Sequence, residues 1–288
     1  MDFFSLFLIL VGFSTIFYCY TQKIPASLSL VMSNFIIFFF WWIAVLLFDY
    51  DGHITWRELG FNPLLTLKYS TLFSLELFNL NILTLVSSMF IHSGPLHLLM
   101  NMLILILMGL PFEERVGGRA FVKIYLTSGL LGSLLTGLSA IHLGTGEADS
   151  YHIGASGAVF GIMGAFAYLY PRDEIPMLLG FIFLHRVPVF IAAVVFAGAE
   201  TAFVVASSTD NIGHDTHLIS LVIGALFAPY FLSSITSTPL ATLDHLDKLA
   251  STVNLQKILQ KAKNADESDV REAWIQKFHE EIKETKDD

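Results

Sequence analysis

The chain has 288 residues, of which 54% are hydrophobic and only 14% are charged, whereas a soluble domain usually carries about 25% charged residues. This composition excludes a soluble globular enzyme and predicts an all-α polytopic membrane protein in contact with the lipid bilayer. The net charge of −9 excludes the basic face that a nucleic-acid partner would require. The single Cys19 excludes an internal disulfide or a cysteine zinc cluster. We expect no cofactor.

Seven apolar runs approach the length of about 20 residues that a membrane-spanning helix requires. They cover residues 3–20, 30–48, 96–111, 121–142, 154–171, 187–206 and 216–235. Glycine and serine interrupt several of these runs, which is tolerated where neighbouring helices pack closely. An odd number of spans places the two ends of the chain on opposite sides of the membrane.

The charges of the short loops assign these sides, because Lys and Arg are enriched in cytoplasmic loops. One set of loops holds only Arg57 and Lys68. The other set adjoins the Lys-bearing tail and holds Lys23, Arg115, Arg119, Lys123, Arg172 and Arg186. We therefore predict an outer N-terminus and a cytoplasmic C-terminus. The short loops and the absence of a positively charged leader favour the plasma membrane of a prokaryote.

Two segments lie outside the predicted spans. The apolar part of 49–95, residues 71–91, would invert every later loop if it spanned the membrane, so we interpret 49–95 as an outer loop that is re-entrant or partly sunk in the interface. The tail, 236–288, is predicted to be soluble. Val270, Trp274, Phe278 and Ile282 recur every fourth residue, with Asp266 or Ser268 as N-cap, and predict an amphipathic helix. This helix would cover itself or the membrane surface, or bind a partner.

Four polar residues lie within the outer ends of three spans, although polar side chains in spans are costly and mark functional candidates. Ser156 begins the fifth span and His217 the seventh, while His97 and Asn101 share one face of the third. Histidine can accept the proton that makes serine a nucleophile. We identify no acidic residue within a span at that depth, so the pattern favours a Ser-His dyad over a triad.

The supporting residues fit acyl transfer. The side chains of His97 and Asn101, with the backbone N–H of Ser156, can donate to the oxyanion that acyl transfer produces. Gly154 and Gly157 allow the backbone to turn tightly at Ser156. Small residues on both the fifth span and the seventh allow these helices to approach closely enough for Ser156 to reach His217.

These motifs resemble those of the rhomboid family. Gly154-Ala155-Ser156-Gly157 is similar to its GxSG box, His97-x-x-x-Asn101 to its HxxxN motif, and Glu114-Arg115 to its acidic-Arg pair. His217 followed by Gly224 is similar to HxxGxxxG, with Ser220 in place of the first glycine. The resemblance covers roughly residues 92–235, and the ordered combination of motifs is specific.

The resemblance implies an intramembrane serine protease that cleaves membrane proteins in or near a transmembrane helix. Ser156 would be the nucleophile, His217 the general base, and His97, Asn101 and Gly157 the oxyanion site. Phe160 would stack on His217, while Gly154 and His92 would support the site. The domains would be an extra N-terminal helix with its linker (1–29), a six-helix core (30–235) and a cytosolic helical tail (236–288).

Other interpretations stay open. A rhomboid-like pseudoprotease would bind transmembrane helices without cleaving them, but such proteins lack the serine or the histidine. His214 competes with His217 for the role of base. A metal site of His152, His214 and His217 lacks a ligand motif such as HExxH. A transporter or channel is disfavoured because no inverted repeat is evident and we identify no charged residue on a pathway through the spans.

Overall fold

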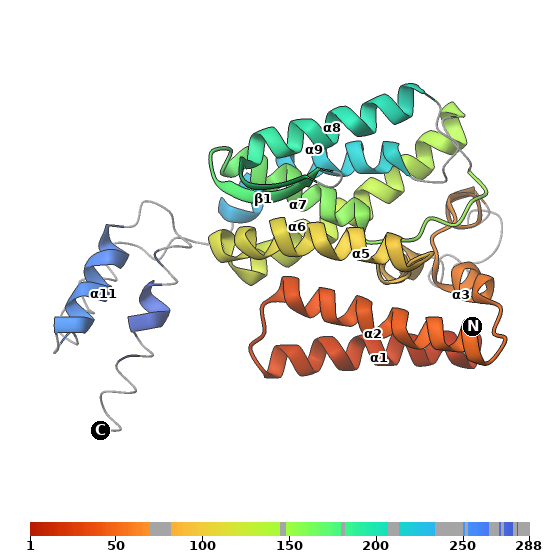
Figure 1. The fold of residues 1–288 in the computed structure, drawn as a ribbon, viewed down its shortest axis with the longest axis horizontal. Coiled ribbons are helices and arrows are strands. Elements are labelled where there is room, and N and C mark those ends of the chain that lie inside the picture. Colours follow the sequence, from red (N-terminus) through yellow and green to blue (C-terminus); the bar gives the residue numbers. More distant parts are fainter. Residues whose placement is uncertain are drawn as a thin grey trace.

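The computed structural model describes residues 1–68, 82–144, 148–179, 182–206, 213–233, 250, 253–264, 271, 274–278 and 281. Its main helices run side by side in a bundle (Figure 1). They are α1 (Phe3–Thr21), α2 (Ala26–Leu47), α5 (Pro95–Ile104), α6 (Leu110–Leu143), α7 (Ser156–Leu169), α8 (Val189–Val205) and α9 (His214–Ser233). A π-helical turn, Leu105–Gly109, joins α5 to α6. Each predicted span therefore coincides with a helix of the bundle.

The helices have the apolarity that a bilayer requires. In the described part of the chain, α1, α2, Pro95–Leu143 and His214–Leu232 are long and apolar enough to cross a membrane, and α7 and α8 are shorter apolar helices. Gly117, with φ of 77°, interrupts the helical conformation within Pro95–Leu143. This break separates the two spans predicted at 96–111 and 121–142.

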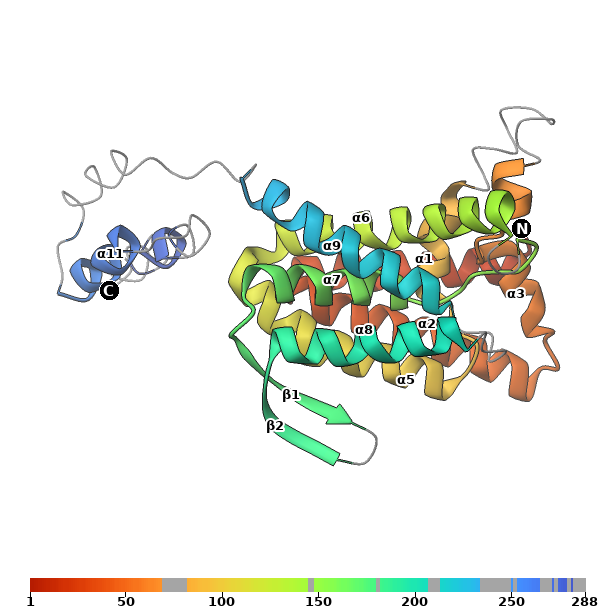
Figure 2. The same ribbon diagram turned by 90° about the horizontal axis from the view of Figure 1, so that it is seen from above.

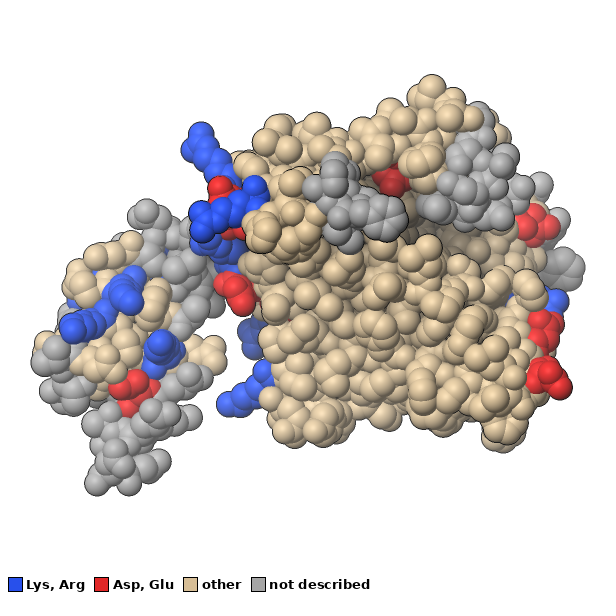
Figure 3. All heavy atoms as spheres, viewed as in Figure 1, with Lys and Arg blue, Asp and Glu red and all other residues tan. Residues whose placement is uncertain are grey.

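The outer surface of the bundle is apolar over its middle. Large apolar side chains such as Phe13, Phe39, Val194 and Leu226 are more than half exposed, and an apolar surface of this extent indicates contact with lipid. Lys and Arg gather at one end of the bundle, together with some Asp and Glu, while the opposite end shows mainly Asp and Glu (Figure 3). The chain is an integral, multi-pass membrane protein.

The N-terminal helix packs on the bundle. The α1 and α2 helices form an antiparallel pair, in which Gly12 lies against Ile37 and Ser33. At the N-terminal end of α1, the Asp2 side chain accepts a hydrogen bond from the Ser5 N–H at 2.6 Å and so caps the helix. The Asp2 N–H donates to Glu58 in α3 (Gly52–Leu59). Residues 3–20 are thus anchored at both ends.

A buried carboxylate fixes the start of α2. Both oxygens of Glu113 accept hydrogen bonds at 2.7 Å, one from the Ala26 N–H and one from the Ser27 N–H. A helix N-terminus has unsatisfied N–H groups that favour an anion. The resemblance pairs Glu114 with Arg115, but Glu114 is exposed and Glu113 is the buried acid.

The α7 and α9 helices make the closest contact in the bundle. A Cβ added at Gly224 of α9 would overlap the backbone oxygen of Gly161 in α7, and one added at Gly164 would overlap the backbone oxygen of Leu221. Ser220 is fully buried at this contact, where it faces Gly132 of α6. Serine fits at the first glycine position of the HxxGxxxG motif because its neighbour is itself a glycine.

The outer loop consists of short helical pieces where the structure describes it. They are α3, a π-helical turn at Leu64–Lys68, a helical segment at 82–87 and a 3-10 turn at Ser88–Phe90. Phe61 pairs with His152 through two backbone hydrogen bonds of 3.0 and 2.8 Å, which tie this loop to the segment before α7. The prediction for 71–91 falls largely outside the described residues, which resume at 82.

Two features were not predicted. An antiparallel hairpin of β1 (Glu174–Leu179) and β2 (Ile182–Pro188) connects α7 to α8 and projects from the bundle (Figure 2). In the tail, α11 (Val253–Lys263) contributes Leu255, Ile258 and Leu259 to a small apolar cluster. The predicted amphipathic helix is described only in part: Phe278 is buried in that cluster and Trp274 packs on it, while Asp266, Ser268, Val270 and Ile282 lie outside the described residues.

The glycine contact between α7 and α9 predicts a specific loss of stability. Replacing Gly224 by Ala drives a methyl group into the α7 backbone, and overpacking of this kind costs about 1–3 kcal/mol. The matched control is Gly198→Ala in α8, where an added Cβ meets no atom within 4 Å. Thermal unfolding in detergent should show a lower Tm for Gly224→Ala only, and equal Tm values would contradict the contact.

Candidate active site

The turn before α7 is held from two sides. Gly154 has φ of 121°, a conformation that L side chains rarely adopt. Its N–H donates to the Ser88 carbonyl at 2.9 Å, and the Ala155 N–H donates to Nε2 of His92 at 3.5 Å. Ser156 follows as the first residue of α7. The outer loop therefore fixes the position at which Ser156 leaves the turn.

His92 supports this turn as a neutral ring. Burial, reinforced by repulsion from His97, lowers the pKa of His92 to about 3. Its Nε2 accepts from the Ala155 N–H, so the single proton of the neutral imidazole lies on Nδ1. Acidification within the physiological range therefore leaves this contact intact.

His97 faces the same turn from α5. A Cβ added at Gly154 would lie 2.7 Å from Nε2 of His97 and 3.8 Å from Oγ of Ser156, so both side chains border that point. The Ser93 N–H donates to Nδ1 of His97 at 3.4 Å. Because a backbone N–H can only donate, Nδ1 is an acceptor and Nε2 of the neutral ring carries the proton. His97 thus presents a donor towards Ser156.

Asn101 lies one turn further along α5 and is buried. Its side-chain nitrogen donates to the His97 carbonyl at 2.9 Å. An amide nitrogen has two hydrogens, so this bond uses one of them. Gly157, the next residue after Ser156, is buried against Ser220 and Thr216 of α9.

His217 lies against α7 on the face that carries Ser156. Its ring stacks on the ring of Phe160, with centroids 4.4 Å apart and planes 5° apart. Phe160 follows Ser156 by four residues, which places both on one side of the helix. The structure thus brings the predicted histidine and aromatic residue together, one turn along α7 from Ser156. His152 instead lies in the paired loop, where burial lowers its pKa against the opposing charge of Asp215.

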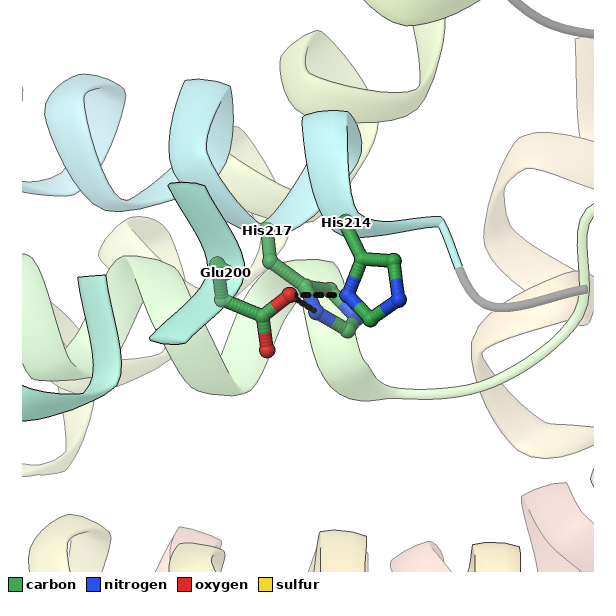
Figure 4. Close-up of side chains that lie close together, drawn as sticks. All are labelled: Glu200, His214 and His217. Carbon is green, nitrogen blue, oxygen red and sulfur yellow. Dashed lines mark hydrogen bonds and ion pairs between the residues drawn. The ribbon is translucent and has the colours of Figure 1, made fainter. Parts of the chain in front are cut away.

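A carboxylate that the sequence analysis missed completes this cluster. Glu200 of α8 lies between His214 and His217 of α9, and the three side chains point toward one another (Figure 4). Its Oε2 lies 3.1 Å from Nδ1 of His217 and hydrogen-bonds Nδ1 of His214. The prediction that no acidic residue lies within a span at this depth is wrong, and so is the premise that the spans lack a charged residue. Glu200 lies within the span predicted at 187–206, six residues before its end, so the sequence already held this signal.

The same three residues, Glu200, His214 and His217, form a group whose side-chain atoms could bind a metal ion. One atom each from Glu200, His214 and His217 lies within 4.8 Å of the others. The set differs from the combination weighed from the sequence, because His152 is not part of it. Oε2 of Glu200 is already in a hydrogen bond with Nδ1 of His214.

Comparison with known proteins agrees with the motifs. A family model described as the Rhomboid domain matches residues 79–234, more than half of the chain. The chain belongs to the rhomboid family. The polytopic helical fold predicted from the sequence is thereby confirmed, with the β1–β2 hairpin as an addition. No solved structure gives a significant match.

Several rhomboid relatives share part of the sequence. RHOMBOID-like protein 5 of Arabidopsis thaliana is 32% identical over 42% of this chain and 39% of its own length. Rhomboid protein 1, mitochondrial, of Saccharomyces cerevisiae is 30% identical over 53% of this chain and 43% of its own length. Rhomboid-type serine protease 2 of Emericella nidulans is 41% identical over 27% of this chain and 14% of its own length. The chain thus matches less than half the length of each of these relatives.

The packing of His97 on Gly154 predicts coupled stabilities in this rhomboid protein. Gly154→Ala should destabilise the fold, because it adds backbone strain of about 1–3 kcal/mol and a clash with His97. In a His97→Ala background the clash is removed, so the same substitution should lower Tm by less. A double-mutant cycle of thermal unfolding in detergent measures this coupling. Additive effects would contradict the contact between the two residues.

Proposed function

We propose that the chain is an intramembrane serine protease that hydrolyses peptide bonds in or near the transmembrane helices of membrane proteins. The observation that carries this proposal is the stacking of His217 on Phe160, one turn beyond Ser156 on the same face of α7. The geometry supports a proton path from the serine hydroxyl to the imidazole. Relatives named as serine proteases add further support.

Each residue then has a role in acyl transfer. Ser156 Oγ attacks the carbonyl carbon of the scissile peptide bond as its proton passes to Nε2 of His217. The N–H of His97, the remaining amide hydrogen of Asn101 and the backbone N–H groups of the Ser156–Gly157 turn would stabilise the oxyanion. Collapse of the tetrahedral intermediate breaks the C–N bond, and His217 returns the proton to the leaving amine. Water then hydrolyses the acyl-enzyme by the same route.

The proposal extends to the arrangement in the membrane. Lys and Arg gather at one end of the bundle (Figure 3), which supports a cytoplasmic C-terminus and an outer N-terminus. The catalytic core would span residues 30–235, with 1–29 and 236–288 as additions. The plasma membrane of a prokaryote stays a prediction, since two relatives are named as mitochondrial.

Substitution of the nucleophile tests the activity. Ser156→Ala should abolish cleavage of membrane-protein substrates by the purified, reconstituted protein, because no other group supplies the attacking oxygen. The matched control is Ser128→Ala, since Ser128 is a buried serine whose hydroxyl bonds its own helix at Ile124. This variant should retain cleavage. The readout is the appearance of product fragments on a gel with time.

Two results would contradict the proposal. Cleavage that persists in Ser156→Ala would exclude this serine as the nucleophile. A folded wild type that retains a transmembrane helix but never cleaves it would instead support the pseudoprotease.

A further inference from the structure

Glu200 is the only charged residue of α8, an otherwise apolar helix. The side chain is 13% exposed, and a carboxylate inside a membrane-spanning helix is costly unless it has partners. Its partners are His214 and His217, which lie three residues apart on one face of α9 (Figure 4). The geometry therefore brings a carboxylate to the histidine that faces Ser156.

The direction of these contacts follows from the chemistry of the groups. An ionised carboxylate can only accept hydrogen bonds, so the imidazole nitrogens that face Glu200 must donate. Oε2 lies 3.1 Å from Nδ1 of His217. A neutral imidazole with its proton on Nδ1 has a lone pair on Nε2. This is the form of His217 that can accept the proton of Ser156.

We propose that Glu200 is a positioning residue for His217, which converts the expected Ser-His pair into a Glu200–His217–Ser156 relay. The proposal rests on the proposed protease function. Glu200 selects the tautomer with a free Nε2 and stabilises the imidazolium that forms when Ser156 gives up its proton. No proton passes to Glu200 itself.

His97 of the same site provides a contrast with His217. His97 has a backbone donor, Ser93 N–H, at its Nδ1 and therefore keeps its proton on Nε2. His217 has a carboxylate at its Nδ1 and therefore keeps its proton there. Two histidines of one site are thus held in opposite tautomers, one as a donor to the oxyanion and the other as an acceptor for the serine proton.

The described groups around the His217 ring come from α5, α7, α8 and α9. Phe160 of α7 covers one face of the ring. The titratable groups that face it are Glu200 of α8, His214 of α9 and His97 of α5, the last of which is close enough for charge repulsion. Glu200 is the only anion among these described groups, so it is the group that can face the imidazolium formed when Ser156 gives up its proton.

The test uses the full-length protein in detergent and a fluorophosphonate probe, which phosphonylates an activated serine as an Oγ–P bond forms and the P–F bond breaks to release fluoride. The rate of labelling is measured against pH for the wild type and Glu200→Gln. We expect Glu200→Gln to label roughly 10- to 100-fold more slowly, the size of the loss seen when the outer hydrogen-bond partner of a metal-bound imidazole is removed. We also expect the acidic midpoint of its profile to move to lower pH.

The matched control is Glu174→Gln, because Glu174 is an exposed carboxylate of the β1–β2 hairpin, 3.8 Å from Arg186. It should match the wild type in both rate and midpoint. A purely structural role of Glu200 would lower the labelled amount and the Tm without moving the midpoint. That result would overturn the proposal. So would an equal loss of labelling rate in His214→Gln and Glu200→Gln, with neither variant shifting the pH midpoint.

The outcomes also separate this inference from the proposed function. If the folded wild type is not labelled, or is labelled equally in Ser156→Ala, the protease function fails and the relay with it. If the wild type is labelled at Ser156 while Glu200→Gln keeps the wild-type rate and midpoint, only the role of Glu200 is overturned.

Discussion

The close contact of α7 with α9 is the constraint on which the site depends. In a bilayer the lipid tails are as apolar as leucine, so helices associate through packing rather than through a hydrophobic driving force. Gly164 and Gly224 allow the two backbones to touch. This distance brings the His217 ring onto Phe160, beside Ser156. Any side chain larger than hydrogen at these positions would separate the serine from its proposed base.

The polar groups around this contact come from every part of the bundle. The outer loop holds Gly154 and Ala155 through Ser88 and His92. His97 comes from α5 and Glu200 from α8. Each of these groups has a defined direction of hydrogen bonding because its partner can only donate or only accept. The site is therefore specified by tautomers as well as by distances.

Much of this arrangement was predictable from the sequence, because long apolar runs dictate helices and small residues dictate their close packing. The rest depends on pairings that no local pattern encodes. The role of Glu200 becomes evident only when α8 lies against α9. The loop charges that assign the sides of the membrane do not predict the hairpin at 174–188. Glu113 and Glu114 are adjacent, and only the approach of α2 decides which one is buried.

The central claim is that Ser156 is activated by its surroundings. Its most direct test is mass-spectrometric mapping of the fluorophosphonate adduct on the intact, folded protein. The account predicts a single adduct on Ser156 that disappears when His217 is replaced by Ala. An adduct on another serine, or labelling of Ser156 that is independent of His217, would contradict it.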